Sequence, residues 1–366
     1  MRFAQQLPET QMKNKLYILS AVLTLLIFGC DKNDQQDTNI GISPEAGANY
    51  KSGDLVSVKT HYSADYKPDS IVYFVDSVRV GSLKDSAALS LKTDTMPVGP
   101  RMITARIYKA GKTREVSTNI VLFPSKAPVD YTYKVIKVFP HDTSCFTEGL
   151  LYQDGFLYES GGGTTANEIG QSSLRKEDLN SGKVLQKIMI DPKVFAEGIS
   201  IVADKLIQLT YREKIIYVYD KNSFKLLNTF TNDVGIEGWG LCYDGKKLYM
   251  DDSTNRIFFL DKNNYHQIGY IDVYDNKGPV NEINELEYID GKLYANIWKT
   301  NTIIVIDPKT GAILEKIDLT SLYPADKRSP NADVLNGIAY DAQGKRIFIT
   351  GKKWPHLYQV EFRKAQ

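Results

Sequence analysis

The 366-residue sequence has few cysteines, few histidines and almost no excess of charge. Three cysteines are too few for a disulfide scaffold, and four scattered histidines leave little for a zinc site. The 45 Lys and Arg residues are balanced by 44 Asp and Glu residues, so the net charge is only +1. A nucleic-acid binder normally has a basic excess or stripe, and we therefore expect no nucleic-acid partner.

Aromatic residues, in contrast, are abundant. The chain has 23 Tyr and 14 Phe, and they occur in short alternating runs that favour β structure. The length alone suggests about two domains, with ample chain to bury a core. These features predict an all-β protein and argue against disorder and against a helical bundle.

Residues 1–30 have the parts of a lipoprotein signal peptide. Lysines at 13 and 15 precede an apolar run at 16–28, which is too short for a comfortable membrane span of ~20 residues. Residues 27–30, Ile-Phe-Gly-Cys, resemble a bacterial lipobox, in which Cys30 is acylated and becomes the mature N-terminus. The alternative is an uncleaved anchor helix. Either way we expect a cell-envelope protein tethered to a bacterial membrane, on the periplasmic side or the outer surface.

The two remaining cysteines, Cys145 and Cys242, lie about a hundred residues apart, each beside a segment that reads as a strand. This placement favours two buried free thiols over a disulfide bridge, which stays the alternative.

Two regions precede the main body of the chain. Residues 31–50 are polar and lack apolar periodicity, which predicts a flexible tether. Residues 51–124 contain about seven short alternating segments separated by turn residues, with a plausible hairpin at 109–112. That pattern predicts a small immunoglobulin-like β-sandwich, which we interpret as a spacer or docking module. Residues 124–128 form the hinge to the rest of the chain.

From residue 130 to 366 one hairpin pattern recurs: a short strand, an Asp/Gly turn and a return strand. The copies start 42–52 residues apart, and they lie at 150–158, 199–207, 241–249, 286–294 and 338–348. A period in the forties with several strands per unit is typical of a β-propeller. We therefore predict a C-terminal five-bladed β-propeller, with four or six blades as the alternative.

The fifth unit stops at its third strand, 357–362, and lacks an outer strand. Residues 131–139 resemble the outer strands of the other units and are the candidate to supply it. Closing a ring with strands from both ends of the chain removes open sheet edges.

In such a hairpin, the residues before the first strand and after the second lie at the same end. Across the five repeats these sets contain carboxylates, amides, lysines and all three Trp, at 146–149, 159–162, 195–198, 210–211, 237–240, 251–252, 284–285, 296–299, 336–337 and 350–354. Any one of them could serve packing alone. Together they predict a pocket for a small, partly apolar substrate, in which a carboxylate between aromatic faces has a raised pKa.

Nine motifs then stand in an order that resembles a known family. They occupy 146–150, 158–161, 172–175, 195–198, 237–241, 284–288, 295–298, 333–339 and 350–355. Together they resemble the plant-type glutaminyl-peptide cyclotransferases, which include bacterial members. The resemblance covers about residues 132–363. It implies a five-bladed propeller that works without a metal or other cofactor on peptides or proteins with an N-terminal glutamine.

The resemblance implies that Glu197 is the catalytic acid/base residue. It also implies a pocket with aromatic walls and two groups for polar parts of the substrate: Phe146, Phe195, Trp239, Trp298, Asn284 and Lys352. Two further lining positions depart from the plant pattern. Glu148 stands where plant members have Gln, and bacterial members resemble this sequence at that position. Tyr211 replaces a Trp. The segment 162–169 is longer than usual, which predicts a loop over the mouth.

The function that follows is conversion of an N-terminal glutamine to pyroglutamate with release of ammonia. The neutral α-amine would attack the side-chain amide while Glu197 moves protons and Lys352 or Asn284 steadies the oxyanion. One alternative is a non-catalytic envelope propeller that binds a peptide or glycan. A third possibility is a scaffold for outer-membrane assembly.

Overall fold

The computed structural model describes residues 39–166 and 169–366. The regular secondary structure of the described chain is almost entirely β-strand, as predicted, and its helical content is one 3-10 turn, Ala325–Lys327. No helix in these ranges is long and apolar enough to cross a membrane. The signal segment and its acylation site, Cys30, lie outside the described residues.

The N-terminal region consists of two sheets that share one core. The smaller sheet has the order β1(Gly41–Ser43), β3(Leu55–His61), β6(Leu89–Lys92), and the larger has the order β2(Ala48–Lys51), β8(Lys112–Phe123), β7(Gly99–Lys109), β4(Ser70–Val75), β5(Val78–Leu83). Every second residue of β3 and β4 is buried, which is the period of a strand with one face on a core. Val56 and Val58 of the smaller sheet pack with Ile71 and Tyr73 of the larger.

This region begins earlier than the sequence predicts. β1 and β2 fall within 41–51, where a tether was expected, and they pair with β3 and β8. They are short edge strands with few apolar residues, so periodicity gave no signal for them. The predicted hairpin is confirmed: Lys109 pairs with Lys112, and Ala110 and Gly111 have φ of 47° and 75°, the left-handed conformations that such a tight turn needs.

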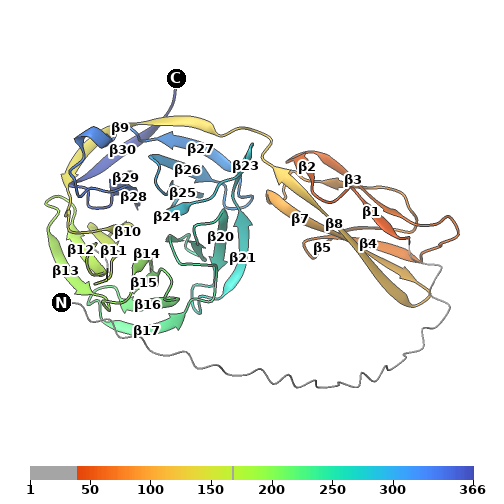
Figure 1. Ribbon diagram of the computed structural model, residues 1–366, viewed down its shortest axis with the longest axis horizontal. Coiled ribbons are helices and arrows are strands. Elements are labelled where there is room, and N and C mark those ends of the chain that lie inside the picture. The colour runs from red at the N-terminus through yellow and green to blue at the C-terminus, as the bar shows by residue number, and fades with distance from the viewer. Residues whose placement is uncertain (1–38, 167–168) are drawn as a thin grey trace, which may run out of the picture. The chain divides into compact units, whose positions relative to one another are not determined.

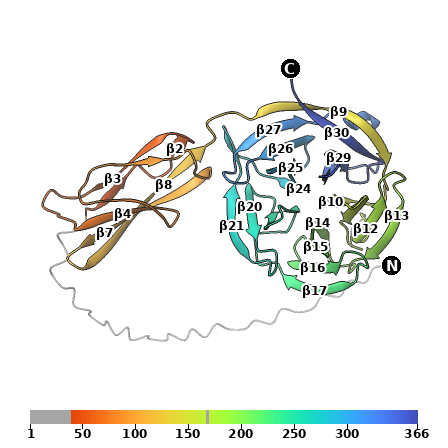
Figure 2. The same ribbon diagram turned by 180° about the vertical axis from the view of Figure 1, so that it is seen from behind.

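Three four-stranded antiparallel sheets follow, each built from one sequence repeat. They are β10(Thr147–Gln153), β11(Phe156–Gly161), β12(Ser173–Asp178), β13(Val184–Met189); β14(Ala196–Val202), β15(Lys205–Thr210), β16(Ile215–Asp220), β17(Leu226–Thr231); and β18(Leu241–Tyr243), β19(Leu248–Asp251), β20(Arg256–Leu260), β21(Gln267–Asp272). The first two strands of each sheet form the predicted hairpin. Figures 1 and 2 show the sheets around a common centre, with β10 and β14 on the inner side of their sheets.

The last two repeats merge into one eight-stranded sheet that completes the ring. Its order is β24(Ile283–Ile289), β25(Lys292–Ile297), β26(Thr302–Ile306), β27(Ile313–Asp318), β9(Val129–Pro140), β30(His356–Lys364), β29(Arg346–Gly351), β28(Leu335–Asp341). β9 pairs antiparallel with β30, so the predicted outer strand is confirmed. β9 also pairs in parallel with β27, an edge contact that the sequence did not predict. A small two-stranded sheet, β22(Tyr274–Asp275) and β23(Gly278–Pro279), follows β21.

Apolar side chains from neighbouring sheets fill the spaces between them. Tyr158 and Leu174 from the β10–β13 sheet, for example, pack with Ile199 and Leu206 from the β14–β17 sheet. Cys145 and Cys242 are both buried free thiols, which confirms that prediction. Because the apolar residues lie between sheets, the polar ends of the inner strands can meet at the centre.

Candidate active site

Irregular pairing of the inner strands orients the central side chains. The register between the first two strands shifts at the same place in four repeats: Thr147/Gly149, Ala196/Ile199, Ile283/Leu286 and Leu335/Ile338. A β-bulge bends its strand and re-aims a side chain, and bulges are common beside active sites. Three polar residues lie at these bulges and line the central cavity: Glu148, Glu197 and Asn284.

Glycines allow the inner strands to approach one another at this level. A Cβ atom on Gly198 would lie 2.4 Å from the Trp239 carbonyl oxygen, and one on Gly240 would lie 2.3 Å from the Asn284 carbonyl oxygen. No side chain fits at such distances. The Gly198 amide instead donates a 2.8 Å hydrogen bond to the Trp239 carbonyl, which joins two neighbouring sheets.

All nine residues singled out from the sequence line one cavity of about 260 Å³: Phe146, Glu148, Phe195, Glu197, Tyr211, Trp239, Asn284, Trp298 and Lys352. Four further residues line the cavity: Ile169, Lys299, Asp333 and Val334. Lys299 belongs to the set 296–299 that was predicted for the pocket, and Ile169 to the segment expected over the mouth. Asp333 and Val334 were not foreseen as lining residues, although their place before the fifth inner strand could have indicated them.

Five aromatic rings form a continuous wall. Their centroids are separated by 6.5 Å between Phe146 and Phe195, and by 5.9 Å between Phe195 and Tyr211. The series continues over 6.4 Å from Tyr211 to Trp239 and 5.6 Å from Trp239 to Trp298, with the two indoles edge to face. Such tilted and T-shaped contacts are the favoured geometry for aromatic pairs. The wall is therefore fixed in shape and apolar.

Glu237, which belongs to the predicted set 237–240 but does not line the cavity, holds part of this wall. Glu237 accepts hydrogen bonds from the Trp239 indole Nε1 at 3.0 Å and from Arg212 Nε at 2.7 Å. The Arg212 guanidinium in turn lies 4.6 Å from the centre of the Tyr211 ring. Glu237 thus fixes the rotation of the indole that faces the cavity.

Glu148 and Lys352 form a buried ion pair beside Phe146. The Lys352 ammonium donates to both Glu148 oxygens, at 2.6 and 2.7 Å, and lies 4.7 Å from the centre of the Phe146 ring. Asn336 Nδ2 donates to Glu148 Oε2 at 3.4 Å. Burial raises the pKa of Glu148, and the Lys352 ammonium opposes that shift. Both side chains of the pair are almost fully buried, so bulk solvent screens their interaction little.

Glu197, unlike Glu148, is a buried acid without a salt-bridge partner among the described residues. Only 5% of the residue is exposed. Burial raises its pKa well above the usual range, the nearby Glu148 charge adds to this, and Lys352 opposes it. A carboxyl group that is buried, close to a like charge and without its own cation favours the protonated form at neutral pH.

Asn284 offers an open acceptor beside this acid. Its Oδ1 atom is buried and has no hydrogen-bond partner among the described residues. An unsatisfied buried amide oxygen costs free energy, so it suits an N–H donor on a bound molecule.

Several residues from the sets predicted to line the pocket do not reach the cavity. Trp354 is fully buried against Tyr323 and Tyr358, so this tryptophan is a core residue and the pocket prediction was wrong for it. Glu285 instead accepts hydrogen bonds from the backbone amides of Leu150 and Ile338, which links three inner strands.

The chain is similar to known proteins in sequence and in structure. Residues 103–362 match the sequence profile of the family described as glutamine cyclotransferase. A glutaminyl-peptide cyclotransferase of Arabidopsis thaliana is 37% identical over 235 residues, which is 63% of this chain and 72% of the plant protein. The crystal structure of Myxococcus xanthus glutaminyl cyclase superposes on 65% of this chain and all of its own, with a TM-score of 0.59 and 33% identity. The chain therefore belongs to the glutamine cyclotransferase family.

Proposed function

We propose that this protein is a glutaminyl-peptide cyclotransferase, which converts the N-terminal glutamine of peptides or proteins to pyroglutamate and ammonia. The observation that carries the proposal is the state of Glu197. It is a buried carboxyl with a raised pKa and no counter-ion of its own, at the wall of an aromatic cavity. Family membership supports the same reaction.

The cavity suits one amino acid with an uncharged side chain. Its volume of about 260 Å³ is small, and its aromatic wall contacts methylene groups without offering them polar partners. The open Oδ1 of Asn284 accepts an N–H of the substrate. Holding amine and amide of one residue in the ring-closing rotamer supplies much of the rate, because well-oriented intramolecular reactions reach effective molarities of roughly 10⁵ M.

Glu197 then carries the proton traffic. The neutral α-amine attacks the side-chain carbonyl carbon, a new C–N bond forms, and the bond from that carbon to the amide nitrogen breaks. Glu197 gives its proton to the departing nitrogen and receives one from the attacking nitrogen, so it ends the turnover as it began. A shuttle of this kind typically contributes ~10²–10⁴-fold. The Asn284 amide or the Lys352 ammonium steadies the oxyanion.

A peptide that begins with Gln tests the function. The wild-type protein should release ammonia and lower the mass of the peptide by that of one ammonia. A peptide that begins with Asn should not react, because its cyclisation would have to close a four-membered ring. Glu197→Gln keeps the shape and removes the shuttle, so turnover should fall by at least about 10². The exposed Glu361→Gln is the matched control and should be unaffected. Turnover by Glu197→Gln at the wild-type rate would refute the assignment, and a wild type that binds the peptide without reacting would favour a non-catalytic binding role.

No step of this scheme calls for a metal ion, since Lys352 and Glu197 supply the positive charge and the protons. We therefore expect chelator-treated protein to retain its turnover at a temperature at which it stays folded. Loss of turnover by folded protein that added metal restores would count against the scheme.

We also infer that the ring is a five-bladed β-propeller. The eight-stranded sheet divides into two four-stranded units, β24–β27 and β28–β30 with β9, which supports the count given by the five hairpins. The shared core of the two N-terminal sheets supports an immunoglobulin-like sandwich.

The location follows from the sequence alone. We propose export and acylation at Cys30, which would anchor the protein to a bacterial membrane. Cys30→Ser should shift the protein from the detergent phase to the aqueous phase in detergent partitioning, and equal partitioning of the two forms would contradict the anchor.

A further inference from the structure

A second cluster of ionisable side chains lies outside the cavity. His141, at the end of β9, meets Glu159 of β11 and Glu177 of β12, and one ligand atom from each lies within 4.8 Å of the other two. All three side chains are buried, and none lines the central cavity. The proposed reaction therefore makes no use of them.

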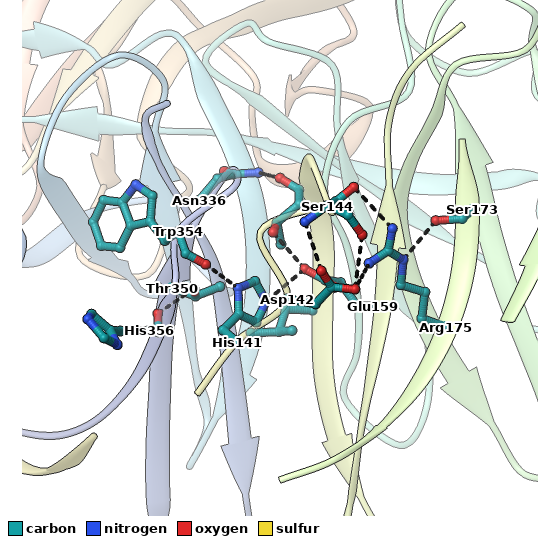
Figure 3. Close-up of polar contacts among 12 residues, drawn as sticks. His141, Asp142, Ser144, Glu159, Ser173, Arg175, Asn336, Thr350, Trp354 and His356 are labelled. Carbon is teal, nitrogen blue, oxygen red and sulfur yellow. Dashed lines mark hydrogen bonds and ion pairs between the residues drawn. The ribbon is translucent and has the colours of Figure 1, made fainter. Parts of the chain in front are cut away.

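A hydrogen bond at Nδ1 fixes the orientation of the His141 ring. Its Nδ1 lies 2.7 Å from the Trp354 carbonyl oxygen, which can only accept, so Nδ1 carries a hydrogen and donates it. Nε2 is then directed at the carboxylates, with Glu159 Oε1 at 3.1 Å (Figure 3). Imidazoles that bind metals usually have this arrangement, in which one nitrogen donates to a carbonyl or carboxylate and the other is left to coordinate.

Two carboxylate oxygens in the cluster have no partner. Glu159 Oε1 accepts from Thr147 Oγ1 at 2.6 Å, but Glu159 Oε2 and Glu177 Oε1 are buried without a hydrogen bond among the described residues. A buried carboxylate oxygen without a donor is costly. A proton shared between the two acids, or a bound cation, would satisfy these atoms.

The nearby Arg175 does not fill this role. Its guanidinium donates to Ser173 Oγ, to Asp142 and to the Ser144 carbonyl, at 3.0–3.1 Å, as Figure 3 shows. Arg175 therefore acts on the cluster only through space, without a hydrogen bond to either acid. Glu159 has the His141 imidazole as its partner, and Glu177 has no salt-bridge partner among the described residues.

We propose that His141, Glu159 and Glu177 form a structural site for a divalent transition-metal ion of the zinc type. An ion at the centre of three atoms 4.8 Å apart lies within about 2.8 Å of each, so a small inward movement reaches Zn–N and Zn–O distances of about 2.0–2.2 Å. The imidazole ligand favours zinc over Ca²⁺ and Mg²⁺, which prefer oxygen ligands. Two carboxylates and a neutral imidazole balance the charge of the ion.

The site lies where the ring closes. His141 follows the strand that joins the last sheet, Glu159 and Glu177 belong to the first sheet of the ring, and the Trp354 carbonyl that holds His141 lies between β29 and β30. An ion bound there would cross-link the first and last repeats. Its expected effect is on stability, and turnover at low temperature would not depend on it.

Zinc alone is the probe. The full-length protein is stripped with a chelator, mixed with ZnCl₂, passed through a desalting column and analysed for metal, and its thermal midpoint is measured with Zn²⁺ and, as a control, with Mg²⁺. We expect one retained zinc per chain and, at saturating zinc, a rise in midpoint of about 5–10 °C. Mg²⁺ should give no rise.

Glu177→Gln keeps the volume and removes a ligand, so zinc affinity should fall at least tenfold. Glu361→Gln on the surface of β30 is the matched control and should bind as the wild type does. A wild type that retains no zinc overturns the proposal, because a shared proton then accounts for the two carboxylates. Equal zinc binding by Glu177→Gln overturns it too. If Glu177→Gln does not fold, X-ray absorption on the zinc-loaded wild type decides: a first shell of one imidazole with oxygen ligands supports the site, and any other shell refutes it.

Discussion

The Glu148–Lys352 pair sets up a quantitative test of the electrostatics of the cavity. Only 2% of Glu148 and 4% of Lys352 are exposed, and the ammonium contacts both carboxylate oxygens at 2.6–2.7 Å. Glu148→Met would leave the ammonium buried without its counter-charge. Removing one partner of a buried pair costs about 3–5 kcal/mol, because the other charge remains out of water. For a domain of this size that lowers the thermal midpoint by roughly 6–20 °C.

Lys352→Met should be comparably destabilising, since it strands the carboxylate of Glu148. The double variant removes both charges, and replacing a whole buried pair by apolar residues is often neutral. The two single effects should therefore not add, and the double-mutant cycle should give an interaction free energy of at least about 2 kcal/mol. Urea unfolding followed by circular dichroism measures all four proteins. Additive single effects would refute the reasoning, because they would mean that each charge is solvated independently of the other.

Three further predictions concern the proposed reaction. Glu148→Gln removes a charge that raises the pKa of Glu197 and leaves the opposing Lys352, so the pKa of Glu197 should fall. The alkaline limb of the kcat/KM profile for a Gln peptide should then move to lower pH, and an unmoved limb would mean that the two acids are not coupled. Trp298→Ala opens the wall beside Trp239 and should raise KM roughly five- to tenfold at a nearly unchanged thermal midpoint, and unchanged kinetics would remove this indole from the substrate site. Glu237→Gln loosens the Trp239 indole and should raise KM more than it lowers kcat, whereas a fall in kcat alone would argue for a direct role in proton transfer.

The ring could be predicted from the sequence because each repeat carries its own local signal. The turn Asp154-Gly155 and the turn Asp290-Gly291 both have positive φ at both residues, the conformation that Asp-Gly favours, and each is flanked by alternating apolar residues. The same logic placed the functional residues, because hairpins of equal length bring their open ends to one level. The parallel contact between β9 and β27 has no such signal, since an edge pairing depends on how the ring closes.

The partners within the site could not be predicted, for a related reason. Lys352 and Glu148 were each expected at the cavity, but their pairing over 204 positions of sequence depends on the rotamers that packing allows. Trp354 follows the second strand of its repeat, as the pocket residue Trp298 does, and yet its side chain lies in the core, where Tyr323 is its edge-to-face partner. Repeat position thus fixes the level of a residue in the ring and leaves open the direction of its side chain.

Burial favours the uncharged form of both groups in the proposed reaction, the carboxyl group of Glu197 and the α-amine of the substrate. Desolvation disfavours charge, so it raises the pKa of a carboxyl group and lowers that of an amine. In this cavity burial and the charge of Glu148 raise the pKa of Glu197, and burial and the neighbouring Asp252 raise the pKa of Asp251, a further buried acid that acts on Glu197. With Lys352 neutralised by Glu148, the site around a bound N-terminus is close to neutral. The proposed cyclisation needs a neutral amine and a neutral carboxyl group. Burial favours both of these forms, so the site needs no separate base to remove a proton from the α-ammonium before the attack.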